Sequence, residues 1–187
     1  MRSRRVFLLS VFLLAISMVF SLTACSGNKV AVRASVSADL DAIKYSDPFA
    51  LGMFNEELEI AELYGIQPEE LASVWFDGFS YSIDEVKVDG NFAFVKVTVT
   101  SKRLDNALDK SNPALTEFMA GVSDSDEAYA RLAQCGPIVL DNLQAEPLHT
   151  DSLTLDYRLE NGLWVITETS RKSLALALGA VYAGRLL

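Results

Sequence analysis

Two pairs of alternating segments, each joined by a tight turn, constrain the fold of this chain more than any other feature. In each pair, apolar and polar side chains alternate along both segments, as in strands with one buried face. The connecting residues include Gly90 in the first pair and Asn161-Gly162 in the second, and such residues are favoured in turns between antiparallel strands. We therefore predict two β-hairpins that join into one antiparallel sheet, with hairpin segments at 81–88 with 92–100 and at 153–159 with 163–166.

The remaining chain has mainly helical signals. Apolar residues at helical spacing predict a first helix over about residues 31–45, which Pro48 ends. Two short helices follow, one between Asn55 and Gly65 and one that starts at Pro68. A helical insertion is expected between the hairpins, over about residues 101–148, although its part after Pro137 is readable as either strand or helix. A last apolar helix is expected after Thr169, with Ser170 as its cap. The expected fold class is therefore α+β.

The N-terminus has the layout of a secretory signal peptide. Three arginines precede an almost wholly apolar run over residues 6–20, and the first acid is Asp39. The apolar stretch from Val6 to Ala24 approaches the length that spans a bilayer, so an uncleaved anchor is the competing interpretation. The sequence Leu22-Thr23-Ala24-Cys25 resembles the lipobox of bacterial lipoproteins.

That resemblance implies where the chain is cut and how it is held. It implies a signal peptide at 1–24, acyl chains such as palmitate on Cys25, a short tether at 25–30 and a single domain at 31–187. The expected location is the cell membrane or envelope, outside the cytoplasm, with the membrane contacted through the lipid on Cys25. One acyl chain alone binds a membrane only marginally, whereas two or three on one cysteine anchor a protein stably.

The charge balance of the mature chain argues against two classes of partner. Without the three leader arginines, 13 basic and 25 acidic residues remain, which gives a net charge of −12. Nucleic acids and anionic lipid surfaces both favour positively charged proteins. We therefore expect no nucleic-acid partner and no broad contact with anionic lipid.

The cysteines give little sign of catalysis. If Cys25 carries lipid, Cys135 has no partner for a disulfide and is expected to be a small buried side chain. Without lipidation, a Cys25–Cys135 disulfide becomes an alternative. A catalytic thiol needs a base, and the only histidine, His149, follows Cys135 by fourteen positions. A core cysteine is the preferred interpretation.

The order of elements has a second resemblance. A first helix, the segment YSIDEVKVDGNFAFVKVTVT and the closing LTLDYRLENGLWVITE are similar to the cystatin-like or nuclear transport factor 2-like domains found in many small lipoproteins. The likeness covers about residues 31–169, but the insertion is longer than that family's usual connection. It implies helices packed in the concave face of a curved sheet, with a cone that serves as a pocket, an active site or a dimer surface.

The residues leave two functional classes open. Aromatic side chains are expected either in the core or along a pocket or partner surface, and those selected are Trp75, Phe79, Tyr81, Phe94 and Trp164. The favoured interpretation is non-enzymatic binding of a small apolar ligand or an envelope protein, with a homodimer through the last helix as a variant. The alternative is a tethered enzyme of the same fold in which Asp84 or another pocket carboxylate acts as general base. No motif indicates a metal or cofactor.

Overall fold

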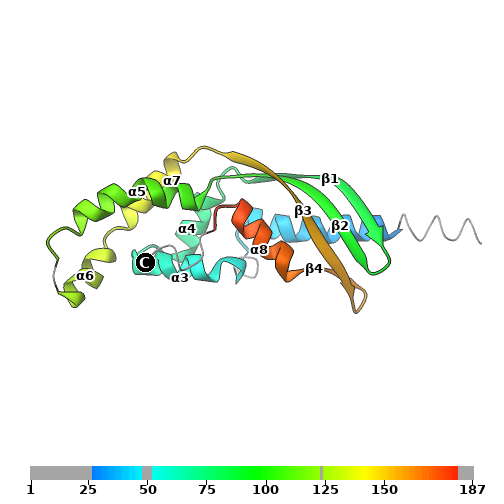
Figure 1. The fold of residues 1–187 in the computed structure, drawn as a ribbon, viewed down its shortest axis with the longest axis horizontal. Helices are drawn as coiled ribbons and strands as arrows, with labels where there is room; N and C mark the ends of the chain where they lie inside the picture. Colours follow the sequence, from blue (N-terminus) through cyan, green and yellow to red (C-terminus); the bar gives the residue numbers. More distant parts are fainter. Residues whose placement is uncertain (1–26, 48–51, 123, 181–187) are drawn as a thin grey trace, which may run out of the picture.

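The computed structural model describes residues 27–47, 52–122 and 124–180, which form an α+β fold with a four-stranded antiparallel sheet and several helices (Figure 1). The predicted signal peptide, the lipobox and Cys25 lie outside the described residues. The apolar side chains of the sheet and the helices form a single buried core.

The sheet is a meander in the order β1-β2-β3-β4, and both predicted hairpins are present. Alternation of side chains across the strands leaves one face buried and one exposed. In β2 the buried residues are Ala93, Val95, Val97 and Val99, as the sequence predicts. The strands are β1 (Ser80–Asp89), β2 (Phe92–Ser101), β3 (His149–Glu160) and β4 (Leu163–Ile166).

A long N-terminal helix covers residues 27–44 and packs on the inner face of the sheet. Its buried side chains recur at helical spacing, from Val32 to Ile43, and are inaccessible to solvent. Two tyrosines of the sheet bond to it: the hydroxyl of Tyr81 donates to Asp41 at 2.9 Å, and that of Tyr157 donates to Asp39 at 2.8 Å. Residues 27–30, which the sequence assigned to a tether, are already helical.

A 3₁₀ turn, η1 (Gly52–Phe54), leads into α3 (Asn55–Leu63), which is followed by α4 (Pro68–Trp75). The two helices meet at Gly65, whose φ is +74°. A side chain at this position would lie 2.1 Å from the carbonyl oxygen of Ala133, so only glycine allows the two chains to approach so closely. The turn between α3 and α4 is thereby packed against the helical insertion.

The insertion leaves the sheet at Ser101 and returns at His149, which are paired residues of β2 and β3. It consists of α5 (Leu104–Phe118), α6 (Ser125–Leu132) and α7 (Gly136–Ala145). In the segment after Pro137, which is ambiguous in the sequence, the residues up to Ala145 are helical. α5 runs through Pro113 as one helix.

The last described helix, α8 (Glu168–Ala177), packs on β3. The prediction that Ser170 caps it is wrong, because Thr167 is the cap and its hydroxyl accepts from the backbone N–H of Ser170 at 3.3 Å. The Ser170 hydroxyl instead accepts from the backbone N–H of Asp156 at 2.7 Å, which joins α8 to the sheet. The last residues of the expected domain, 181–187, lie outside the described residues.

Candidate functional site

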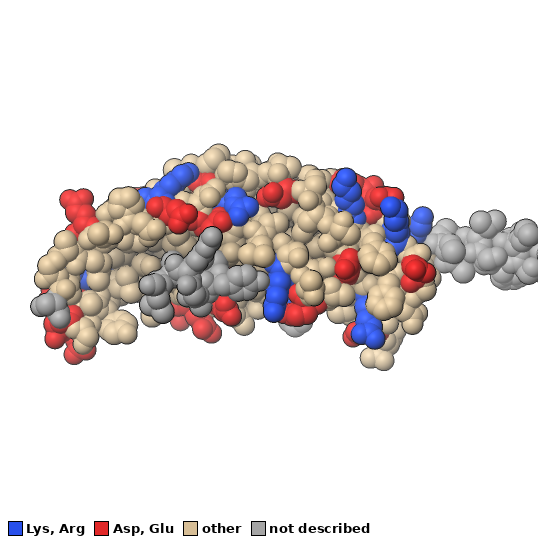
Figure 2. Space-filling view, viewed as in Figure 1, with Lys and Arg blue, Asp and Glu red and all other residues tan. Residues whose placement is uncertain are grey.

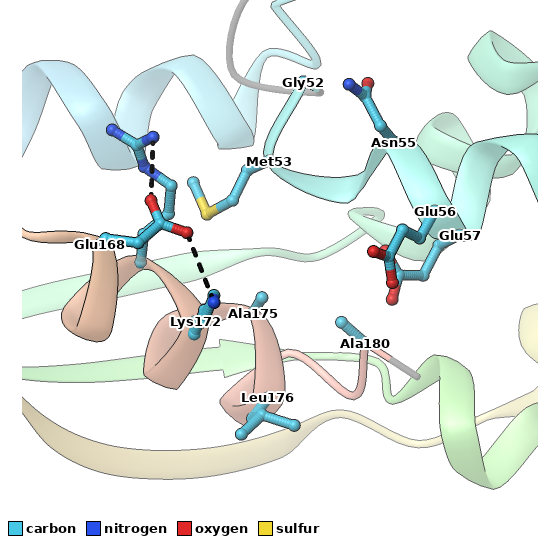
Figure 3. Close-up of a pocket in the computed structure, with 11 residues that line it drawn as sticks. Gly52, Met53, Asn55, Glu56, Glu57, Glu168, Lys172, Ala175, Leu176 and Ala180 are labelled. Atoms are coloured by element: carbon cyan, nitrogen blue, oxygen red, sulfur yellow. Dashed lines mark ion pairs between the residues drawn. The ribbon is translucent and has the colours of Figure 1, made fainter. Parts of the chain in front are cut away.

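A cavity of about 210 Å³ lies between η1 and α3 on one side and α8 on the other (Figure 3). We call it the α3–α8 cavity. Its volume is below the range that holds drug-sized ligands, so it suits a smaller molecule. The described residues that line it are Gly52, Met53, Asn55, Glu56, Glu57, Glu168, Arg171, Lys172, Ala175, Leu176 and Ala180.

The cavity lies beside α8, which turns one face toward the core and leaves the other partly exposed. Leu174 and Leu178 are fully buried and fix the helix on the core. Ala175, next to Leu174, is only partly buried, and its small side chain lines the cavity together with Met53. The apolar part of the lining comes from these two residues together with Leu176 and Ala180.

The two walls of the cavity differ in the sign of their net charge. From α3, Glu56 and Glu57 point toward α8, on the side of the cavity away from Glu168 (Figure 3). On α8, Glu168 lies between two cations, with a carboxylate oxygen 3.6 Å from Arg171 and the other 3.8 Å from Lys172. The α3 wall is thus acidic, while the α8 wall has one more positive charge than negative.

Arg171 also connects the cavity to a hydrogen-bonded pair, formed by the buried Tyr157 and the partly buried Asp39. Burial raises the pKa of Asp39, and the hydrogen bond from Tyr157 and the positive charge of Arg171 act in the opposite direction. The pKa of Tyr157 is raised as well, first by burial and then by the charge of Asp39. The attraction between Arg171 and Asp39 therefore helps to hold Arg171 at the cavity wall.

The five aromatic residues selected from the sequence do not meet at one site. Trp75, Phe79 and Trp164 are buried in the core, and the indole N–H of Trp75 donates to the carbonyl oxygen of Leu178 at 2.9 Å. Tyr81 is partly buried and bonds to the N-terminal helix, while Phe94 is exposed on the outer face of the sheet. None of the five is among the described residues that line the α3–α8 cavity.

Asp84 lies on the outer face of the sheet, at a bulge between Ile83 and Glu85. Hydrogen bonds from the hydroxyls of Ser82 and Thr98, each at 2.8 Å, lower its pKa. A general base near neutral pH usually has a raised carboxyl pKa in a sheltered site. Asp84 has the opposite environment.

A buried carboxylate that the sequence did not reveal lies where the insertion rejoins the sheet. The side chain of Glu146 is 1% exposed and pairs with Lys110. It also accepts from Asn106 at 3.1 Å and lies 2.8 Å from the Nε2 atom of His149. Burial raises the pKa of Glu146, but the hydrogen bonds from these three partners outweigh it and the net pKa is lowered. We call these four residues the junction cluster.

Cys135 and His149 are not brought together as a catalytic pair. Cys135 is buried, and burial raises the pKa of its thiol, which makes it a poor nucleophile. His149 bonds instead to Glu146 in the junction cluster. Within the described part of the chain, no group of three or more His, Cys, Asp and Glu side chains is placed to hold a metal ion.

No protein-family model, curated protein or solved structure matches this chain. Among the helices described, none combines the length and the apolar character needed to cross a bilayer. Arguments about function therefore rest on the residues themselves.

Proposed function

We propose that this chain is a lipid-anchored binding protein of the bacterial cell envelope. The lipobox-like sequence Leu22-Thr23-Ala24-Cys25 supports alkylation of the Cys25 thiol with a diacylglyceryl group and cleavage of the bond before Cys25. The domain would then lie outside the cytoplasm, with the α3–α8 cavity as its ligand site.

The observation that carries the binding role is the combination of an apolar floor with walls of opposite charge. A ligand with an apolar body would rest on Met53 and Leu176. A positively charged group would lie toward Glu56 on the α3 wall, and an acidic group toward Lys172 and Arg171. Amino acids and short peptides with an apolar side chain have this distribution. Complementary charge would favour them over purely apolar molecules of the same size.

The lining also favours binding over catalysis. The described lining residues include no cysteine, histidine, serine or tyrosine to act as a nucleophile or shuttle a proton, so only the carboxylates of Glu56, Glu57 and Glu168 are candidate bases there. Asp84, the base expected from the sequence, is not among these lining residues, and its pKa is lowered. The enzyme interpretation therefore has less support than the binding interpretation.

We further infer that the domain is a variant of the cystatin-like or nuclear transport factor 2-like cone. The support is a long helix, residues 27–44, held across a four-stranded antiparallel meander by the tyrosine–aspartate bonds. The insertion between β2 and β3 would be the feature that distinguishes this chain from shorter members.

Native mass spectrometry of residues 26–187 tests the binding role. We expect a small co-purifying adduct, or binding when amino acids and dipeptides are screened. The variant Ala175→Phe fills the cavity and should abolish binding, while Ser173→Phe, at an exposed position on the same helix outside the lining, should not. No binding from any member of the screen, or binding that survives Ala175→Phe, would contradict the proposal.

A further inference from the structure

One end of the molecule brings together three structural elements, none of which lines the α3–α8 cavity. The described part of the N-terminal helix starts there, and both hairpin turns lie there, at the opposite end of the long axis from α6 (Figure 1). The turns are those that connect Asp89 to Phe92 and Glu160 to Leu163. We call this region, residues 27–33, 87–92 and 158–165, the hairpin end.

The hairpin end exposes large apolar side chains. Leu163 is 69% exposed, Val30 is 68% exposed and Phe92 is 50% exposed. In the sheet register, Arg158 is paired with Phe92 on one side and with Val165 on the other, so these three side chains share the outer face. The Arg158 guanidinium lies 5.9 Å from the ring centre of Phe92. Apolar side chains beside cationic ones suit the interface between lipid headgroups and acyl chains.

The charge of the hairpin end differs from that of the rest of the domain. Its segments contain four basic residues, Lys29, Arg33, Lys87 and Arg158, and two acidic ones, Asp89 and Glu160. Two of the cations have acidic neighbours: Lys87 lies 3.2 Å from Glu85, and Arg158 lies 4.0 Å from Glu160. On the face seen in Figure 2, several Lys and Arg side chains gather at this end, among acidic ones. The hairpin end therefore lacks the excess of negative charge that the mature chain has as a whole. Such an excess would repel an anionic membrane.

The position of the expected lipid brings this end to the bilayer. Cys25 precedes the first described helical residue, Gly27, by two positions. Two residues span at most about 7 Å even when fully extended, which is comparable with the depth of about 5–10 Å to which interfacial side chains are buried. A domain attached so closely has little freedom to move its hairpin end away from the membrane.

We propose that the hairpin end is a membrane-contact surface, in which Phe92, Leu163 and Val30 insert at the bilayer interface. This inference rests on the proposed lipidation of Cys25. It goes beyond anchoring, because it fixes the orientation of the domain. α6 then points away from the membrane.

Thiol accessibility on vesicles tests this orientation. The full chain is expressed in a bacterium, purified from the membrane and reconstituted into vesicles of phosphatidylcholine and phosphatidylglycerol. The two matched variants are Leu163→Cys, at the hairpin end, and Tyr129→Cys, on α6, whose native side chains are 69% and 67% exposed. The background is low, because Cys135 is buried and the lipid occupies the thiol of Cys25. Each rate of reaction with a polar maleimide is divided by the rate in denaturant.

We expect Leu163→Cys to react roughly tenfold more slowly than Tyr129→Cys, because an interfacial thiol is shielded from a polar reagent. The difference should persist when the protein is diluted with more lipid. Equal rates would overturn the inference, as would protection that disappears on dilution, since a second copy would then be covering the surface.

Intact mass separates this failure from failure of the proposed anchor. If the purified protein carries acyl chains and the two rates are equal, only the contact surface is refuted. If the mass shows no acyl chains on Cys25, the anchor and the contact surface are both refuted.

Discussion

The sheet region and the helical insertion are held together by different interactions. In the sheet region, the central strands bury apolar side chains completely, as at Val95, Val97 and Leu155. In the insertion, α5 and α7 contribute apolar residues to the core, but no residue of α6 is buried. The insertion meets the sheet at a polar group, the junction cluster around Glu146.

The difference shows how a long insertion can be added without disturbing a sheet. The chain leaves at Ser101 and returns at His149, which are partners in the β2–β3 ladder, so the strands pair as they would around a short turn. The α3–α8 cavity and the hairpin end both adjoin the sheet region. We therefore expect mutations in α6 to leave binding and membrane contact intact, and mutations in the central strands to remove both by unfolding.

The largest expected effect is at the centre of the sheet. Leu155 is fully buried, and Leu155→Ala should lower the free energy of unfolding by about 2–5 kcal/mol, because it leaves a cavity in a packed core. The matched variant Leu132→Ala, on α6, should cost less than about 1 kcal/mol, because that helix buries no residue. Urea denaturation followed by circular dichroism measures both. Equal losses would show that the two regions are equally well packed.

The junction cluster should give an intermediate, pH-dependent effect. Glu146→Gln should cost about 1–3 kcal/mol at pH 7, because Lys110 and His149 lose their buried carboxylate. The control Glu127→Gln removes an ion pair in which both side chains are exposed, and should cost at most about 1 kcal/mol.

The sign of the pH dependence follows from the lowered pKa of Glu146. A carboxyl whose pKa is lower in the folded state stabilises that state above its unfolded pKa, near 4.5, and this contribution is lost as pH falls through the folded pKa. The difference between wild type and Glu146→Gln should therefore be largest at neutral pH and shrink in acid. If the difference in unfolding free energy between wild type and Glu146→Gln stayed constant from pH 7 to pH 3, folding would not lower the pKa of Glu146.

The smallest effect is expected at Asp84. The change Asp84→Asn keeps the shape of a fully exposed side chain, and should leave the free energy of unfolding nearly unchanged. Ligand binding measured by native mass spectrometry should be unchanged, because Asp84 does not line the α3–α8 cavity. If the Asp84→Asn variant folded normally but lost the function of the protein, the result would favour the enzymatic interpretation.

The sheet was predictable because its signals are local. The alternation at residues 92–100 and the turn at Asn161-Gly162 specify strand faces and connections without distant contacts. The short run from Ile138 to Leu140 was ambiguous, since three apolar residues fit either a strand or a turn of helix. Ser170 was misread as a cap because the residue that caps α8, Thr167, is also a common capping type.

The sites were less predictable because their residues come from distant segments. Glu146 gives no local signal, and two of its partners, Asn106 and Lys110, precede it by 40 and 36 positions. The cavity depends on the small side chain of Ala175 lying opposite Met53, a pairing that only the folded chain creates. The five aromatic residues were selected for their residue type alone, but most of them, Trp75, Phe79 and Trp164, are buried in the core.

The central claim is that the domain is attached to a membrane through Cys25, and intact mass spectrometry tests it most directly. The full chain would be expressed in a bacterium and extracted from the membrane fraction. The account predicts a mass equal to residues 25–187 plus a diacylglyceryl group, with or without a third acyl chain, and loss of these groups in the variant Cys25→Ser. A chain that retains residues 1–24, or one that begins at Cys25 without acyl groups, would contradict the account.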